Sequence, residues 1–118
     1  EKDGKPEALP VIEIRPHTGY YDYSNKYTKG ATDYIVPAEI PDEIAAMIGD
    51  YAVRAHEALG CRGYSRADFR LTEDGKAYIL EVNTAPGMTA TSLVPKAAKA
   101  KGISMSEFVS AIMSMAKV

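Results

Sequence analysis

The most constraining feature of this 118-residue chain is a pair of alternating segments within residues 63–83, separated by Asp74-Gly75. An Asp-Gly pair between two such segments is typical of a β-hairpin, because it suits the positive φ angles of a two-residue type I′ turn. Side chains along a strand alternate between the two faces of a sheet, so the turn decides which residues share a face. We therefore expect an antiparallel pair of strands.

Counting outward from this turn places Asp68 opposite Glu81 and Arg66 opposite Asn83. These four side chains then lie on one face of the hairpin. The opposite face carries an apolar set able to pack against helices: Phe69, Leu71, Tyr78, Leu80 and Val82. One face is expected to pack, which leaves the other free for chemistry.

Two acids that face each other across a hairpin need a neutralising partner, because their Cβ atoms lie only about 4.5–5.5 Å apart. A hard divalent cation would offset the repulsion between Asp68 and Glu81, and Asn83 would add an amide oxygen. The alternative is that Arg66, Arg70 or a nearby lysine pairs with the acids in a solvated network. The charge pattern alone leaves both interpretations open.

The segment after the second strand has features of an anion site. Pro86-Gly87 is a typical centre of a type II turn, in which the Gly87 N–H is open to a ligand. Ser92 stands at the start of a short helix expected over residues 93–101, where a hydroxyl and free N–H groups meet the positive end of the helix dipole. The alternative is a plain turn followed by an ordinary helix cap.

The remaining elements are one more strand and two more helices. Residues 9–15 alternate β-branched and polar residues, which is typical of a strand. Residues 41–59 carry an apolar stripe at helical spacing, and Ser104 with Glu107 forms a capping box before a terminal helix. Residues 16–38 show no clear period over most of their length. A connection this long is more often a functional lid than a passive linker.

Composition excludes several classes of protein. The chain has 14 Lys+Arg against 16 Asp+Glu, so it lacks the basic footprint of a nucleic-acid-binding protein. No apolar run approaches the roughly 20 residues that a membrane-spanning helix needs. Cys61 is the single cysteine, as expected in a reducing compartment. We therefore expect a cytoplasmic protein with neither nucleic acid nor membrane as a partner.

Four motifs occur together in an order that resembles a known enzyme family. They are Leu9-Pro-Val-Ile-Glu-Ile, Tyr20-Tyr-Asp-Tyr-Ser-Asn-Lys-Tyr27, Gly60-Cys-Arg-Gly-Tyr-Ser-Arg-Ala-Asp-Phe69, and Leu80-Glu-Val-Asn-Thr-Ala-Pro-Gly-Met-Thr89 through Ser92-Leu93. The chain resembles the C-terminal part of D-alanine–D-alanine ligases, which are ATP-grasp enzymes. The resemblance implies an α+β fold with a mostly antiparallel sheet and flanking helices.

The same resemblance implies that residues 1–118 form a C-terminal ATP-grasp subdomain. The chain opens without Met and enters an apolar strand almost at once, which also suggests a C-terminal piece of a longer protein. The N-terminal substrate domain and the first ATP-grasp subdomain would then be absent. We expect the isolated piece to be inactive.

In that family, ATP phosphorylates the carboxylate of one D-alanine, and the amine of a second D-alanine attacks the acyl phosphate. The dipeptide enters peptidoglycan precursors, which links the reaction to the cell wall and cell shape. The implied partners are ATP, D-alanine, the N-terminal domains and a second copy in a homodimer. Two alternatives stay open. One is another ATP-grasp carboxylate–amine or depsipeptide ligase using D-lactate or D-serine, and the other is a non-catalytic module that binds metal or nucleotide.

The resemblance names the cation as Mg²⁺, with two ions bound beside the nucleotide and Mn²⁺ as a possible substitute. Asp68 would hold one ion, Glu81 would bridge both, and Asn83 would join the second. His17 and His56 have no cysteine or second histidine at ligand spacing, so we expect ordinary surface or hydrogen-bonding roles for them.

The resemblance also implies the residues that hold the reacting groups. Arg66 would steady the acyl phosphate and the oxyanion formed from it. The Gly87 N–H would donate to that oxyanion, a preorganised dipole of the kind that often supplies the largest catalytic contribution. Ser92 and the Leu93 N–H would hold the carboxylate of the second D-alanine.

The tyrosine-rich motif resembles the mobile loop that covers the active site in this family. Lys26 would reach a nucleotide phosphate, and Tyr27 would face the second substrate and favour an amine nucleophile over a hydroxyl. Tyr20 would lie beside the adenine. Leu80 matches a position that lines the adenine pocket, although strict alternation places it on the face opposite Glu81. Closure of the loop would keep water from the acyl phosphate.

Overall fold

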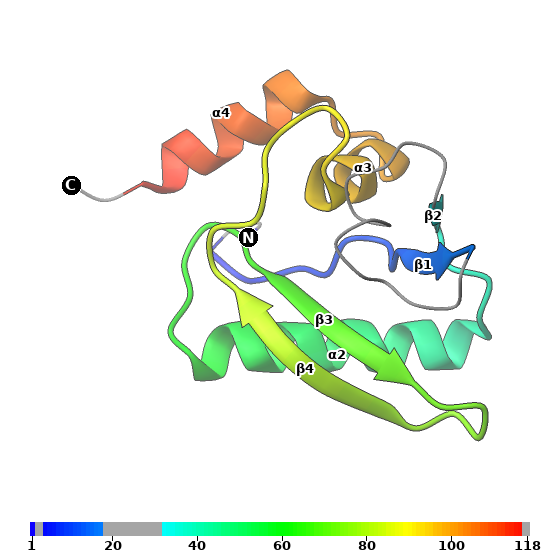
Figure 1. Cartoon of the computed structure of the whole chain (residues 1–118). Coiled ribbons are helices and arrows are strands. Elements are labelled where there is room, and N and C mark those ends of the chain that lie inside the picture. The colour runs from blue at the N-terminus through cyan, green and yellow to red at the C-terminus, as the bar shows by residue number, and fades with distance from the viewer. Residues whose placement is uncertain (2–3, 18–31, 117–118) are drawn as a thin grey trace.

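The computed structural model describes residues 1, 4–17 and 32–116. Its elements in chain order are β1 (Glu13–Pro16), β2 (Thr32–Ile35), α2 (Asp42–Ala58), β3 (Arg66–Leu71), β4 (Ala77–Asn83), α3 (Leu93–Ala100) and α4 (Met105–Met115). The described strands form two antiparallel pairs, β1–β2 and β3–β4, with the helices beside them (Figure 1). The expected α+β class with antiparallel strands and flanking helices is confirmed.

Helix α2 forms where its apolar stripe predicts it. Pro41 is the N-cap, and Asp42 and Glu43 place negative charge in the first turn, where it complements the helix dipole. The helix stops at Leu59, and Gly60 then takes a positive φ of 67°. Helix α2 contacts both β3 and β4 and crosses behind the hairpin in the view of Figure 1. It therefore covers one side of the hairpin.

Helices α3 and α4 pack against each other, and α3 carries most of the buried apolar residues. The capping box of α4 is confirmed, since the Ser104 hydroxyl accepts from the Glu107 N–H at 3.1 Å and Glu107 accepts from the Ser104 N–H at 3.2 Å. Buried apolar residues of the described chain include Ile48 on α2 and Val94, Ala97 and Ala98 on α3. Within the described ranges, no helix has the length and apolar character to cross a membrane.

The strands near the N-terminus differ from the prediction. β1 covers only Glu13–Pro16, and residues 9–12 are not in a strand, although the Val11 carbonyl accepts from the Ala38 N–H at 2.8 Å. β2, which pairs with β1, lies inside the stretch expected to lack regular structure. Four residues are too short a window for alternation to stand out, so this strand depends on its partner.

The turn of the β3–β4 hairpin is longer than expected. The Thr72 N–H donates to the Lys76 carbonyl at 2.8 Å, and the Gly75 N–H donates to the Thr72 carbonyl at 3.1 Å. Gly75 has a φ of 87°, so the connection is a three-residue loop that ends in a left-handed glycine. The predicted two-residue turn is wrong. Leu71 consequently pairs with Ala77, which shifts the register by one residue near the loop.

A β-bulge restores the predicted register farther along the hairpin. The ladder skips Leu80, and Asp68 then faces Glu81 as predicted. Between the loop and the bulge the shifted register holds, so Tyr78 faces Arg70 and shares its face. The placement of Tyr78 on the apolar face is therefore wrong. Strict alternation also fails at Leu80, because a bulge interrupts the alternation of side chains.

Candidate functional site

The polar face of the hairpin brings the two predicted acids onto one guanidinium. Arg66 Nε lies 2.8 Å from Asp68 Oδ1, and Arg66 Nη2 lies 3.1 Å from Asp68 Oδ2. Arg66 Nη2 also lies 3.7 Å from Glu81 Oε1. These contacts are ion pairs between Arg66 and the two acids, as the alternative to a metal site expected. Two carboxylates nevertheless share one guanidinium here, and the Glu81 side chain is 60% exposed, so this cluster keeps an excess of negative charge.

Asn83 completes the polar face at the end of β4. It pairs with Arg66 in the ladder, which confirms the predicted register at this position. Its Oδ1 accepts a hydrogen bond from the Ala85 N–H at 2.9 Å, which turns the chain as the strand ends. A carbonyl oxygen has two lone pairs, so this atom can accept one further partner.

The donor set suits a hard cation. Carboxylate and amide oxygens are ligands that Mg²⁺ accepts alongside water and phosphate oxygens. The described residues contain no group of three or more Asp, Glu, His or Cys side chains placed to hold a metal. A cation bound to Asp68 and Glu81 would therefore take its other oxygens from the amide of Asn83, from water or from a bound phosphate.

The segment after β4 differs from the predicted turn. Gly87 is not among the described glycines with positive φ, whereas the third residue of a type II turn needs one, so that prediction is wrong. A close approach explains the glycine instead, since a Cβ atom at this position would lie only 2.9 Å from Ser92 Oγ. Within the described chain the Gly87 N–H has no hydrogen-bond partner. It can therefore donate to a ligand.

Ser92 is the N-cap of α3, as predicted, but its side chain does not cap the helix. Its Oγ accepts from the Thr89 N–H at 3.0 Å and lies 2.7 Å from Thr89 Oγ1. Leu93 follows as the first residue of the helix, where backbone N–H groups lack partners within the helix. This corner can receive an anion through Ser92 and the Leu93 N–H.

Most of these residues line one wide groove of about 1470 Å³. The predicted site residues in its lining are Arg66, Asp68, Leu80, Asn83, Gly87, Ser92 and Leu93. Glu81 joins them through its contact with Arg66. Three further predicted residues, Tyr20, Lys26 and Tyr27, lie outside the described residues.

The two histidines take the ordinary roles expected of them. His17 Nε2 lies 3.2 Å from Asp33 Oδ2 at the surface. His56 is buried, with Nδ1 2.7 Å from Ser65 Oγ and Nε2 3.2 Å from Glu1 Oε2. The hydrogen bond from His56 lowers the pKa of the Glu1 carboxyl. This partly buried cluster joins α2 to Glu1 and to the start of β3.

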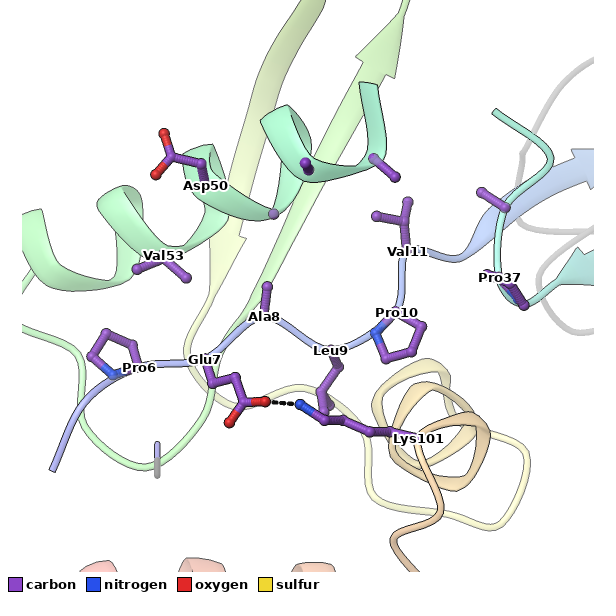
Figure 2. Close-up of a pocket in the computed structure, with 14 residues that line it drawn as sticks. Pro6, Glu7, Ala8, Leu9, Pro10, Val11, Pro37, Asp50, Val53 and Lys101 are labelled. Atoms are coloured by element: carbon purple, nitrogen blue, oxygen red, sulfur yellow. Dashed lines mark ion pairs between the residues drawn. The ribbon is translucent and has the colours of Figure 1, made fainter. Parts of the chain in front are cut away.

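A second groove, of about 550 Å³, lies between residues 6–11 and α2 (Figure 2). Its lining is mainly apolar, with Ala8, Pro10 and Val53 among the side chains. Its charged groups include Glu7 and Lys101, which form an ion pair with each other (Figure 2). This groove therefore offers less polar chemistry than the face that carries Arg66.

Tyr64 lines the wide groove and lies within the Gly60–Phe69 motif, but no sequence pattern gave it a role. The Tyr64 hydroxyl donates a hydrogen bond to the Pro86 carbonyl at 3.2 Å. The two residues are 22 positions apart, and no local periodicity links a side chain to a backbone carbonyl at that distance. Only the tertiary structure brings them together.

Solved structures with the same fold define the class of protein first. A crystal structure of D-alanine–D-alanine ligase from Bacillus anthracis complexed with ATP superimposes with a TM-score of 0.75 and 35% identity, over 93% of this chain and 37% of that chain. The VanG D-Ala:D-Ser ligase from Enterococcus faecalis gives a TM-score of 0.72 and 36% identity, over 90% of this chain and 31% of that chain. The fold is that of an ATP-grasp ligase segment.

The sequence comparisons then name the family. The family model described as D-ala D-ala ligase C-terminus matches residues 1–114. The chain is 47% identical over 112 residues to a D-alanine–D-alanine ligase of Moorella thermoacetica, which covers 95% of this chain. The chain belongs to the D-alanine–D-alanine ligase C-terminus family. It spans 36% of the length of that curated relative.

Proposed function

We propose that the whole protein to which this chain belongs is an ATP-dependent D-alanine–D-alanine ligase. It joins two D-alanines through an acyl phosphate and releases ADP and phosphate, as a step in peptidoglycan precursor synthesis. The convergence of Asp68 and Glu81 on Arg66, beside Asn83, carries this proposal, together with membership of the family. Residues 1–118 supply the C-terminal ATP-grasp subdomain, and the remaining domains supply the rest of the nucleotide and substrate sites.

We assign Asp68, Glu81 and Asn83 to a site for two Mg²⁺ ions, with Mn²⁺ as a substitute. When bound, the ions neutralise the negative charge that develops on the phosphate oxygens during phosphoryl transfer. Arg66 now pairs with both acids. Competition between a cation and Arg66 for Asp68 would leave the guanidinium available to an anion.

The chain's other groups then hold the reacting atoms. Arg66 attracts the acyl phosphate and the oxyanion that forms when the amine attacks. The Gly87 N–H donates to the same oxyanion, and a fixed donor of this kind costs no reorganisation as the charge develops. Ser92 and the Leu93 N–H bind the carboxylate of the second D-alanine.

Several parts of the proposal depend on the sequence motifs alone. The tyrosine-rich motif is the lid, with Lys26 on a phosphate and Tyr27 beside the amine nucleophile. Tyr20 and Leu80 contact the adenine. The cytoplasmic location and the homodimer also stay predictions.

The proposal is tested by assaying the full-length protein with ATP, Mg²⁺ and D-alanine. We expect phosphate release coupled to formation of D-alanyl-D-alanine, measured by mass spectrometry, and no turnover from residues 1–118 alone. ATP hydrolysis without dipeptide would contradict the proposal. Competition with D-serine and D-lactate distinguishes the related ligases, because each second substrate gives a product of different mass.

A further inference from the structure

We propose that Tyr64 is a positioning residue that aims the Gly87 N–H into the site. This inference rests on the proposed function, in which that N–H donates to the oxyanion. The observation behind it is the hydrogen bond from the Tyr64 hydroxyl to the Pro86 carbonyl, at 3.2 Å in a partly buried setting. Pro86 is buried, and its carbonyl is fixed by this bond, whereas Gly87 is exposed and lines the wide groove.

The geometry of the peptide unit links the two groups. The Pro86 carbonyl and the Gly87 N–H belong to one planar peptide, and in a trans peptide they point in opposite directions. The cis peptide bond of the described chain is Val36–Pro37, so the Pro86–Gly87 peptide is trans. A hydrogen bond that orients the carbonyl therefore also orients the N–H. Donation to the carbonyl further polarises the peptide and strengthens the N–H as a donor.

The orientation of the Gly87 N–H depends on the bond to Pro86, because no contact of Gly87 itself fixes it within the described residues. Within the described residues its N–H makes no hydrogen bond, and it has no side chain to pack. On its other side, Ser92 Oγ limits the space, since a Cβ atom would lie only 2.9 Å away. The bond to the Pro86 carbonyl is thus the polar contact that sets the direction of this peptide.

Tyr64 is itself held in place. Its ring meets the Phe108 ring edge to face, with centroids 5.7 Å apart and planes at 79°. Tyr64 also lies two residues before Arg66, where β3 begins. A single short segment therefore carries both the guanidinium and the hydroxyl that orients Gly87, and α4 braces this segment through Phe108.

The test is Tyr64→Phe in the full-length enzyme, which keeps the ring and its contact with Phe108 but removes the donor. We expect kcat for dipeptide formation to fall roughly 3- to 10-fold, the effect of losing one ordinary hydrogen bond, with the KM for D-alanine unchanged. The rate of acyl phosphate formation, measured by positional isotope exchange in ATP, should equal that of the wild type. The reason is that the oxyanion forms only in the second step, when the amine attacks.

Tyr51→Phe is the matched control, because it removes a hydroxyl from α2 at an exposed tyrosine outside the groove lining. It should leave both steps and the thermal unfolding midpoint at wild-type values. A Tyr64→Phe enzyme with wild-type kcat would overturn this inference and leave the proposed function standing. An equal loss in both steps with a lower unfolding midpoint would also overturn it, since that pattern describes a structural brace. If the wild-type enzyme makes no dipeptide, the proposed function fails and the inference fails with it.

Discussion

The two ends of the β3–β4 hairpin differ in how well the alternation of the sequence predicts their register. Near the loop the register is shifted by one residue, and Tyr78 and Ile79 are about half exposed, at 54% and 47%. At the open end, Asp68 faces Glu81 in the register that simple alternation predicts. The bulge at Leu80 separates these regions and compensates for the longer loop. The conformation of the loop therefore sets the register at one end of the hairpin. At the other end, the bulge keeps Asp68 opposite Glu81.

The largest effect should follow from Glu81→Gln in the full-length enzyme. This change removes one charge from the open end, and we expect kcat to fall by more than about 100-fold if the carboxylate helps to hold Mg²⁺. Thermal stability should stay equal or rise slightly, because repulsion between Asp68 and Glu81 is relieved. Initial rates and unfolding midpoints measure the two effects.

Glu73→Gln is the matched control for that experiment, because Glu73 is an exposed acid in the loop of the same hairpin. It should leave kcat unchanged. A large loss of stability in Glu81→Gln with full activity would show that Glu81 is a structural residue.

Deletion of Leu80 should have the next largest effect, because it removes the extra residue of the bulge. The ladder would then run without interruption, so Asp68 would still face Glu81, but the bend and extra twist that the bulge gives to β4 beside the site would be lost. We expect roughly a 100-fold loss of kcat, since misplacement by about 1 Å has a cost of this order. Leu80→Ala keeps the residue count and should retain most of the kcat. Equal kcat losses in the two variants would show that the side chain matters rather than the bulge.

The smallest effect is expected in α4. This helix lies outside the hairpin, so a change in its capping serves as a comparison for the hairpin variants. The backbone hydrogen bond from Ser104 lowers the pKa of the Glu107 carboxyl below its usual value of 4.5. A lowered pKa in the folded state contributes stability above the unfolded value, and this contribution is lost as pH falls through the folded value. The protection of the amides in the first turn of α4 against hydrogen exchange, relative to their intrinsic exchange rates, should therefore be greatest at neutral pH and fall in acid.

Glu107→Gln should remove this acid dependence in the first turn of α4 while leaving kcat unchanged. If the variant and the wild type show the same dependence of exchange on pH below 4.5, the carboxylate of Glu107 is not its source. Unlike the changes at Glu81 and Leu80, this one tests helix capping without touching the site.

Much of the site followed from local patterns. Alternation along a strand placed Asp68, Glu81 and Asn83 on one face, because the side-chain period of two needs no knowledge of the rest of the fold. The capping box at Ser104 was equally local, since it spans one helical turn. The type II turn at Gly87 was not found, because glycine serves there to avoid Ser92 rather than to adopt a positive φ.

The sequence by itself determined the helices, the hairpin and the set of charged residues on its polar face. The tertiary structure decided the bulge at Leu80, the placement of Arg66 between two acids, and the bond from Tyr64 to Pro86. The physical reason is range. Periodicity and capping act over a few residues, whereas the contacts from Arg66 to Glu81 and from Tyr64 to Pro86 join groups far apart in the chain and form only when the chain folds back on itself.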